Sequence, residues 1–216
     1  MNLKQELKKY QNESQEKRPE ALKAIMQASA QKLIDEKVGE NALKVGDKLP
    51  KGTLVNAVNT PVDIYDCLAK GPLVISFYRG AWCPYCNLEL LAYKEILPEI
   101  KALGANFVAI SPELPDHSMT LVEKHGLEFE VLTDVDNAYA RELGLVFRVD
   151  DDLVEVYKKI GIDMEASQGN ANNEIPLPAT FVIDQDGTVI LANVDTDYTK
   201  RLEPSETVKA LKENKK

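Results

Sequence analysis

The sequence predicts an α/β fold in which helices flank a central mixed β-sheet, with a helical extension at the N-terminus. Three observations support this prediction. From about Val45 onward, short, continuously apolar segments alternate with helical stretches, as in sheets covered on both faces. The first forty residues are instead rich in Lys, Glu, Gln and Ala. The 216 residues, 44% of them hydrophobic, suffice for one packed domain with a modest appendage. We therefore expect an extension over residues 1–40 and a domain over residues 43–216.

The N-terminal extension is expected to form a pair of helices. Leu3, Leu7 and Tyr10 recur at helical spacing, and a second apolar stripe follows Pro19, which suits a first helical turn. Both stripes are narrow and the charges are of mixed sign. This pattern favours packing on the main domain or on another subunit over binding to a membrane surface.

The domain begins with a predicted strand–helix–strand unit. Residues 73–78 and 106–110 have the apolar, β-branched composition of buried strands. Between them, residues 87–103 are dense in Leu, Glu, Ala and Lys and end at Gly104, which is typical of a helix. A unit of this size predicts two parallel strands joined by a crossover helix.

The C-terminal third completes the predicted sheet. Residues 180–183 form a third strand, and Asp186-Gly187 predicts a hairpin to a following antiparallel strand. Residues 203–215 are expected to form the last helix. The polar, aperiodic segment 161–174 predicts a mobile loop.

Composition and charge exclude several classes of function. The net charge of −9 disfavours binding to nucleic acid. No apolar run approaches 18 residues, so no membrane span is expected. The charged N-terminus has no apolar core of a secretory signal, which predicts a cytoplasmic protein. Three cysteines cannot form a disulfide framework, so a closely spaced pair points to redox chemistry or metal binding.

That cysteine pair lies in the segment Phe77-Tyr78-Arg79-Gly80-Ala81-Trp82-Cys83-Pro84-Tyr85-Cys86. A strand is expected to end near Arg79 and a helix to begin around Cys83, with Pro84 in its first turn. Unpaired amides and the helix dipole then lower the pKa of the Cys83 thiol. Cys86 falls one turn later on the same face and is expected to be the more buried, within reach of a mixed disulfide at Cys83.

Other interpretations of the cysteines are weaker. A structural zinc needs four ligands, and the remaining candidates Cys67, His117 and His125 have no paired spacing. We therefore predict no metal, and treat Cys67 as a small buried side chain and the two histidines as surface or capping residues. Two inert core cysteines are the other alternative, but the strand end before Trp82 and the proline within the pair favour redox chemistry.

Two motifs carry a resemblance to the thioredoxin fold. Trp82-Cys83-Pro84-Tyr85-Cys86 resembles its active-site motif, and the segment from Leu177 to Asp184 resembles the strand that begins with a cis-proline facing the cysteines. The resemblance implies that Pro178 is cis and that Pro178 and Thr180 support the site. Trp82 and Tyr85 are expected to form an exposed apolar rim for docking a protein or an organic peroxide.

From about Leu43 onward the chain also resembles the alkyl hydroperoxide reductase/thiol-specific antioxidant family, especially its peroxiredoxin-like branch. Aligning Phe77-Tyr78 with that family implies that Cys86 is peroxidatic. Cys83 then replaces a threonine and Arg79 a proline. The family's arginine has its counterpart near Pro178 and is missing, so Arg79, Arg148 or Arg201 is expected to substitute in space.

Two enzymatic mechanisms and one alternative remain open at this stage. In a peroxidase, one thiolate attacks a hydroperoxide, becomes a sulfenic acid and is resolved by the other cysteine. In a disulfide oxidoreductase, Cys83 attacks a substrate disulfide and Cys86 resolves it. Family resemblance favours peroxide and Cys86, whereas helix position favours Cys83. A redox sensor without catalysis is the third alternative.

The expected partners follow from the same chemistry. The substrate is a hydroperoxide or a disulfide, and a thioredoxin-like thiol donor recycles the enzyme. The chain has no glycine-rich phosphate loop, so no flavin or nicotinamide cofactor is expected. The N-terminal helices make a homodimer plausible.

Overall fold

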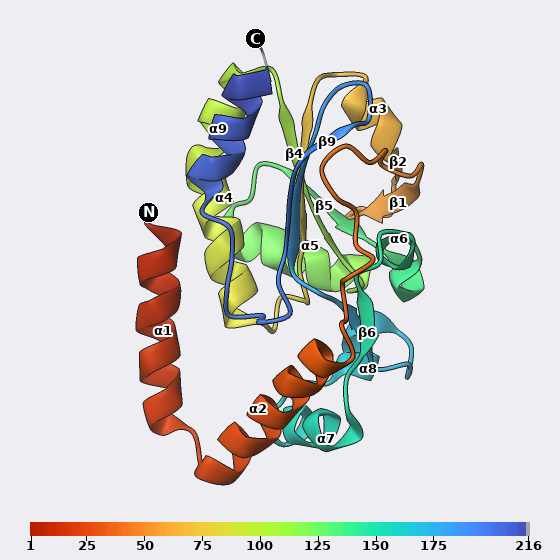
Figure 1. Cartoon of the computed structure of the whole chain (residues 1–216). Helices are drawn as coiled ribbons and strands as arrows, with labels where there is room; N and C mark the ends of the chain where they lie inside the picture. The colour runs from red at the N-terminus through yellow and green to blue at the C-terminus, as the bar shows by residue number, and fades with distance from the viewer. Residues whose placement is uncertain (215–216) are drawn as a thin grey trace.

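The computed structural model describes residues 1–214 and has the predicted mixed α/β architecture (Figure 1). The helices are α1 (Leu3–Lys17), α2 (Glu20–Asp35), α3 (Ile64–Leu68), α4 (Pro84–Ala102), α5 (Pro115–His125), α6 (Ala138–Glu142), α7 (Asp151–Lys159), α8 (Met164–Gln168) and α9 (Pro204–Asn214). The strands are β1 (Thr53–Asn56), β2 (Pro61–Asp63), β3 (Leu73–Phe77), β4 (Asn106–Ser111), β5 (Glu130–Thr133), β6 (Val146–Arg148), β7 (Glu174–Pro176), β8 (Ala179–Ile183) and β9 (Val189–Val194).

Seven strands form the central sheet in the order β2-β1-β5-β4-β3-β8-β9, and β6 and β7 pair separately. The predicted crossover unit is confirmed, because β3 and β4 are parallel and α4 connects them. The predicted hairpin between β8 and β9 is antiparallel. Strand β8 also runs antiparallel to β3, with Phe77 opposite Ala179. The start of β8 therefore lies beside the end of β3, where the cysteine segment begins.

The alternation of side chains along β3 divides the core into two layers. Val74 packs with residues of α4, α9 and α5, whereas Leu73, Ile75 and Phe77 pack with residues of α3 and α6 on the opposite face. All five residues of β3 are buried. This explains the continuous apolar pattern, because both faces of the central strand are covered (Figure 1).

The N-terminal helices are packed onto the domain. Leu3 and Leu7 of α1 belong to the core layer that contains α4, and α2 lies against α7 (Figure 1). The amides of Leu3 and Lys4 donate to the carboxylate of Glu203, close to the start of α9. The helical pair is thus as predicted, and the division into segments 1–40 and 43–216 stays a prediction.

Truncating Leu7 to alanine is expected to destabilise the protein by about 2–4 kcal/mol, because the change empties a buried apolar site between α1 and the core. The free energy of unfolding in urea measures this loss. Ile34→Ala is the matched control, since Ile34 is an exposed aliphatic residue of α2. An equal loss in both variants would contradict a specific contribution of α1 packing.

Segment 161–174 does not form the predicted mobile loop. It contains α8, in which Met164, Ser167 and Gln168 are buried. The Asp163 carboxylate caps this helix by accepting from the Ala166 amide at 3.0 Å. The polar composition of this segment does not make it a loop, because Ser167 donates to Glu113 and Asn170 donates to Asp136, both distant in the chain. Within residues 1–214, no helix is long and apolar enough to cross a membrane.

Candidate active site

The cysteine pair lies at the N-terminus of α4, and residues 78–83 connect the end of β3 to this helix. Cys83 is the N-cap of α4 and Pro84 occupies the first turn, as predicted. The turn closes through the Cys83 amide, which donates to the Gly80 carbonyl at 3.0 Å. Cys86 follows one turn later on the same helix. This arrangement places both thiols at the end of the helix where negative charge is favoured.

Both cysteines are buried, with exposed fractions of 2% for Cys83 and 0% for Cys86. Cys86 was expected to be the more buried of the two, but burial barely distinguishes them. Tyr85 is also buried, and its ring makes edge-to-face contacts with Tyr10 of α1 and with Tyr198, at centroid distances of 5.1 and 5.5 Å. The predicted exposed rim is consequently wrong for Tyr85, because α1 covers it. Trp82 is half-buried and Pro84 is exposed.

The pKa values of the two thiols are shifted in opposite directions. Burial acts to raise the pKa of Cys83, but a hydrogen bond from Cys86 and the charges of Arg79 and Arg201 outweigh it and lower the pKa of Cys83 to about 6. Burial raises the pKa of Cys86 well above its ordinary value, and the Cys83 thiolate raises it further. These opposite shifts favour a thiolate on Cys83 and a retained proton on Cys86.

Arg201 contacts the sulfur of Cys86. Its Nη2 lies 3.5 Å from the Cys86 Sγ, and its Nε donates to Glu89 Oε2 at 2.8 Å. Both side chains of this ion pair are only 2% exposed. Thr180 on β8 donates its hydroxyl to the other Glu89 oxygen at 3.4 Å. Burial raises the pKa of Glu89, and Arg201 opposes that shift. Thr180 and Glu89 therefore fix the position of Arg201 beside the sulfur.

Arg79 is the second buried cation of the site and is 4% exposed. Its guanidinium carbon lies 4.5 Å from the ring centroid of Tyr198 and 4.9 Å from that of Trp82, and it donates a hydrogen bond to the Tyr157 hydroxyl. Among residues 1–214 no carboxylate forms an ion pair with it. Because a buried cation needs a compensating charge, the Cys83 thiolate is the natural counter-ion of Arg79.

The third candidate arginine, Arg148, is exposed and pairs with Asp151 away from the thiols. Pro178 is trans, as are all peptide bonds within residues 1–214, so the expected cis bond is wrong. The Leu177 amide donates to the Leu145 carbonyl at 2.8 Å, so the chain continues extended from β7 into β8, as a trans bond allows. Pro178 does lie near the site, since it lines a small cavity together with Arg79 and residues of α2.

That cavity holds about 20 Å³, which is enough for a water molecule or two. Its walls come from α2, α7, β6 and the start of β8, so the N-terminal extension contributes directly to the surroundings of Arg79. The site as folded is therefore closed to large molecules.

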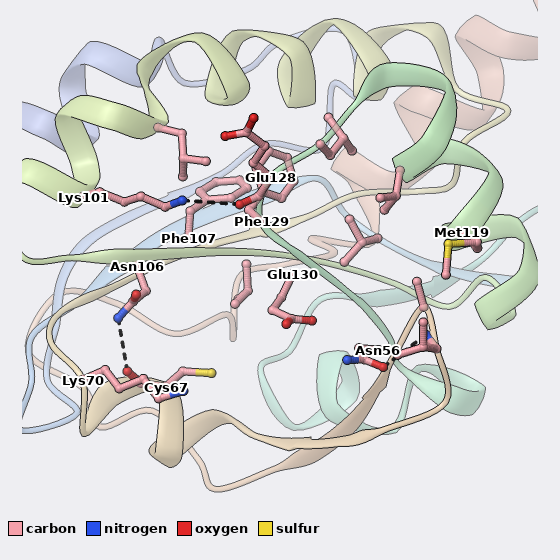
Figure 2. Close-up of a pocket in the computed structure, with 17 residues that line it drawn as sticks. Asn56, Cys67, Lys70, Lys101, Asn106, Phe107, Met119, Glu128, Phe129 and Glu130 are labelled. Atoms are coloured by element: carbon pink, nitrogen blue, oxygen red, sulfur yellow. Dashed lines mark hydrogen bonds between the residues drawn. The ribbon is translucent and has the colours of Figure 1, made fainter.

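Cys67 lies in a different place, at the end of α3, and is half-buried. It lines a groove of about 450 Å³ together with Phe107 and Phe129, and its carbonyl accepts from the Asn106 side chain at 3.4 Å (Figure 2). Asn106 pairs with the first residue of β3, whereas the catalytic candidates follow the last. The length of β3 thus separates Cys67 from the pair, which agrees with the interpretation of Cys67 as a packing residue. Burial raises the pKa of its thiol.

Several residues of the site were missed by sequence reasoning. Glu89 could have been found, because it is a lone acid three residues after Cys86 on an otherwise apolar helix face. Tyr157 and Glu113 come from distant segments and carry no local pattern. His117 and His125 lie at the two ends of α5, and residues 1–214 contain no cluster of three or more potential metal ligands.

Comparison with known proteins agrees with this geometry. The chain is 27% identical over 157 residues to Rv2521 of Mycobacterium tuberculosis, which carries a provisional peroxiredoxin name, covering 73% of this chain and 88% of that protein. It is 30% identical over 105 residues to peroxiredoxin Bcp of Escherichia coli, covering 49% and 67%.

The crystal structure of the M. tuberculosis peroxidoxin BcpB superposes with a TM-score of 0.62 and 21% identity, over 79% of this chain and 97% of that one, so the two proteins share a thioredoxin-like fold. The family model of AhpC/TSA matches residues 45–192, which include β3, α4 and both cysteines of the pair. The chain belongs to the AhpC/TSA family.

Proposed function

We propose that this protein is a peroxiredoxin-like peroxidase that reduces hydrogen peroxide or small organic hydroperoxides through Cys83 and Cys86. The observation that carries the proposal is the buried thiol pair at the start of α4, where Arg201 Nη2 lies 3.5 Å from the Cys86 sulfur and the charges of Arg79 and Arg201 lower the pKa of Cys83. Membership of the family and the peroxiredoxin names of its relatives support the same activity.

Cys83 is the proposed nucleophile. Its thiolate attacks the terminal oxygen of the hydroperoxide, an S–O bond forms and the O–O bond breaks. The departing alkoxide or hydroxide takes the proton of Cys86, which leaves a sulfenic acid on Cys83 and an alcohol or water as product. Cys86 is suited to this donation because it keeps its proton beside the Cys83 thiolate.

Cys86 then completes the cycle as the resolving thiol. Its new thiolate is stabilised by Arg201, whose Nη2 is 3.5 Å from the sulfur. Attack on the sulfur of the Cys83 sulfenic acid forms the disulfide and expels hydroxide, which leaves as water after taking a proton from solvent. A dithiol donor such as a thioredoxin-like protein reduces the disulfide and becomes oxidised. The net reaction consumes one hydroperoxide and one dithiol.

The closed site favours a small oxidant over a protein disulfide. In the reduced protein neither cysteine is more than 2% exposed, so a small hydroperoxide reaches the sulfur more readily than a protein disulfide does. Reduction by a thioredoxin-like protein then requires that the oxidised pair become exposed. The first alternative function is disulfide reduction with Cys83 as the nucleophile. The second is a redox sensor without turnover. We also propose a cytoplasmic location, a thioredoxin-like reductant and a homodimer. A peroxidase assay coupled to the reductant tests the second of these, and sedimentation analysis tests the third.

The test is stopped-flow fluorescence of the reduced protein mixed with hydrogen peroxide and, separately, with a small disulfide. Trp82 is the only tryptophan and directly precedes Cys83, so it reports on the thiol. We expect a fast phase with peroxide, a slow one with the disulfide, and a Cys83–Cys86 linkage by mass spectrometry afterwards. Fast exchange with the disulfide and slow reaction with peroxide would favour the oxidoreductase. A linkage that includes Cys67 would overturn the assigned pair.

A further inference from the structure

A buried carboxylate on the opposite side of the active-site turn has no role in the mechanism described above. Glu113 follows β4, is 2% exposed, and forms no ion pair with any cation among residues 1–214. Its Oε2 accepts from the Ala81 amide at 2.6 Å, and its Oε1 accepts from the Ser167 hydroxyl at 2.8 Å. Burying a carboxylate is costly, so a protein retains one where its hydrogen bonds serve a purpose.

Both backbone polar groups of Ala81 are hydrogen-bonded to side chains. Glu113 accepts from its amide, and the Asn87 side chain donates to its carbonyl at 2.8 Å. Ala81 lies two residues before Cys83, and the Gly80 carbonyl accepts from the Cys83 amide. These bonds hold Ala81 within the turn that leads to Cys83.

The space around the turn leaves little freedom for it to move. Gly80 has a φ of +152°, and a Cβ at that position would lie 2.3 Å from Trp82 Nε1 and 3.0 Å from the Glu113 carboxyl carbon. Glu113 thus packs directly against the turn as well as bonding to it. A side chain at position 80 would therefore clash with Trp82 and press on Glu113.

Residues outside the turn form hydrogen bonds with the backbone of Glu113 and of its neighbour Leu114. Its carbonyl accepts from the Thr133 hydroxyl at 2.7 Å on β5, and the adjacent Leu114 amide donates to the Ser167 carbonyl at 2.9 Å. Ser167 belongs to α8 and is buried. The carboxylate therefore connects the active-site turn to β5 and α8, two elements that contribute no group to the reacting atoms.

We propose that Glu113 is a positioning residue that holds the Gly80–Cys83 turn so that the Cys83 sulfur stays between Arg79 and Cys86. The inference rests on the proposed function in that it takes Cys83 as the nucleophile. Its consequence does not depend on peroxide, because a displaced sulfur loses reactivity toward any electrophile.

The experiment measures the rate of alkylation of Cys83 by iodoacetamide as a function of pH, with the labelled residue identified by fragmentation in the mass spectrometer. In Glu113→Ala the rate at pH 7 is expected to fall by roughly tenfold and the apparent pKa of Cys83 to rise. Glu113→Gln should recover most of the wild-type rate, because its amide can still accept from Ala81 and bond to Ser167. Glu123→Ala, an exposed acid on α5, is the matched control.

A merely structural role would lower the melting temperature without moving the pH profile, and that outcome overturns the proposal. The proposal also fails if Glu113→Gln is as impaired as Glu113→Ala. If Glu113→Ala does not fold, Ser167→Ala replaces it, and a two- to fivefold slower alkylation is then expected; an unchanged rate rejects the inference. Normal alkylation of the wild type without peroxide reduction would reject the proposed function alone.

Discussion

Replacing Cys83 by serine is expected to slow the reaction with hydrogen peroxide by at least about a thousandfold, because the residue supplies the thiolate that attacks the oxygen. At pH 7 a thiol with a pKa of about 6 is about nine-tenths ionised, whereas a free cysteine is ionised to a few per cent. A serine hydroxyl is not ionised at this pH. Rapid mixing with Trp82 fluorescence measures the loss.

Cys86→Ser should give a different result. The first reaction with peroxide is expected to persist within about tenfold, because Cys83 remains between its cationic partners while it loses the hydrogen bond from Cys86. Turnover stops after one event, since no thiol is left to resolve the sulfenic acid. Mass spectrometry after trapping should find that acid on Cys83. Cys67→Ser is the control and should behave as the wild type.

The reverse pattern would reassign the nucleophile. If the peroxide reaction survives in Cys83→Ser and vanishes in Cys86→Ser, the thiol implied by the family alignment is the attacking one. Arg201 would then be the arginine that activates it, because it contacts the Cys86 sulfur. The two variants therefore decide between the helix-position argument and the resemblance.

The elements that carry the cysteines could be predicted from the sequence because their causes are local. An apolar strand, a glycine turn and Pro84 after Cys83 determine where β3 ends and α4 begins. The proximity of β8 to the pair was likewise predicted from a second motif. The boundaries of β3 and α4 depend on residues close together in the chain, where propensity and capping act, whereas the position of β8 was implied by the resemblance to the thioredoxin fold.

What the sequence could not supply depends on contacts between distant segments. Three arginines were candidates, and only the folded chain brings Arg79 and Arg201 to the thiols while leaving Arg148 exposed. The burial of Tyr85 follows partly from α1, whose Tyr10 packs edge-to-face against its ring. Neither periodicity nor spacing within one segment determines which helix covers which side chain.

Replacing Arg79 by methionine is expected to lower the rate of peroxide reduction at pH 7 by about ten- to thirtyfold. Methionine keeps the length and the apolar packing but removes the charge that balances the Cys83 thiolate. The pKa of Cys83 then rises from about 6 toward the free value of about 8.5, so the thiolate fraction at pH 7 falls. The wild-type rate should rise with pH through about 6 and level off by neutrality.

The pH profile separates this electrostatic role from a loss of structure. Because the thiolate is the base form, raising its pKa moves the rise in rate to higher pH, and the variant should approach the wild-type rate near pH 9. Arg79→Lys is expected to be intermediate, since an ammonium keeps the charge but cannot stack on Trp82 and Tyr198 as the planar guanidinium does. Arg148→Met is the matched control at an exposed position. A rate lowered equally at every pH would mean that Arg79 acts on the bound peroxide and not on the ionisation of Cys83, and the thiolate would then owe its stability to Arg201 and Cys86.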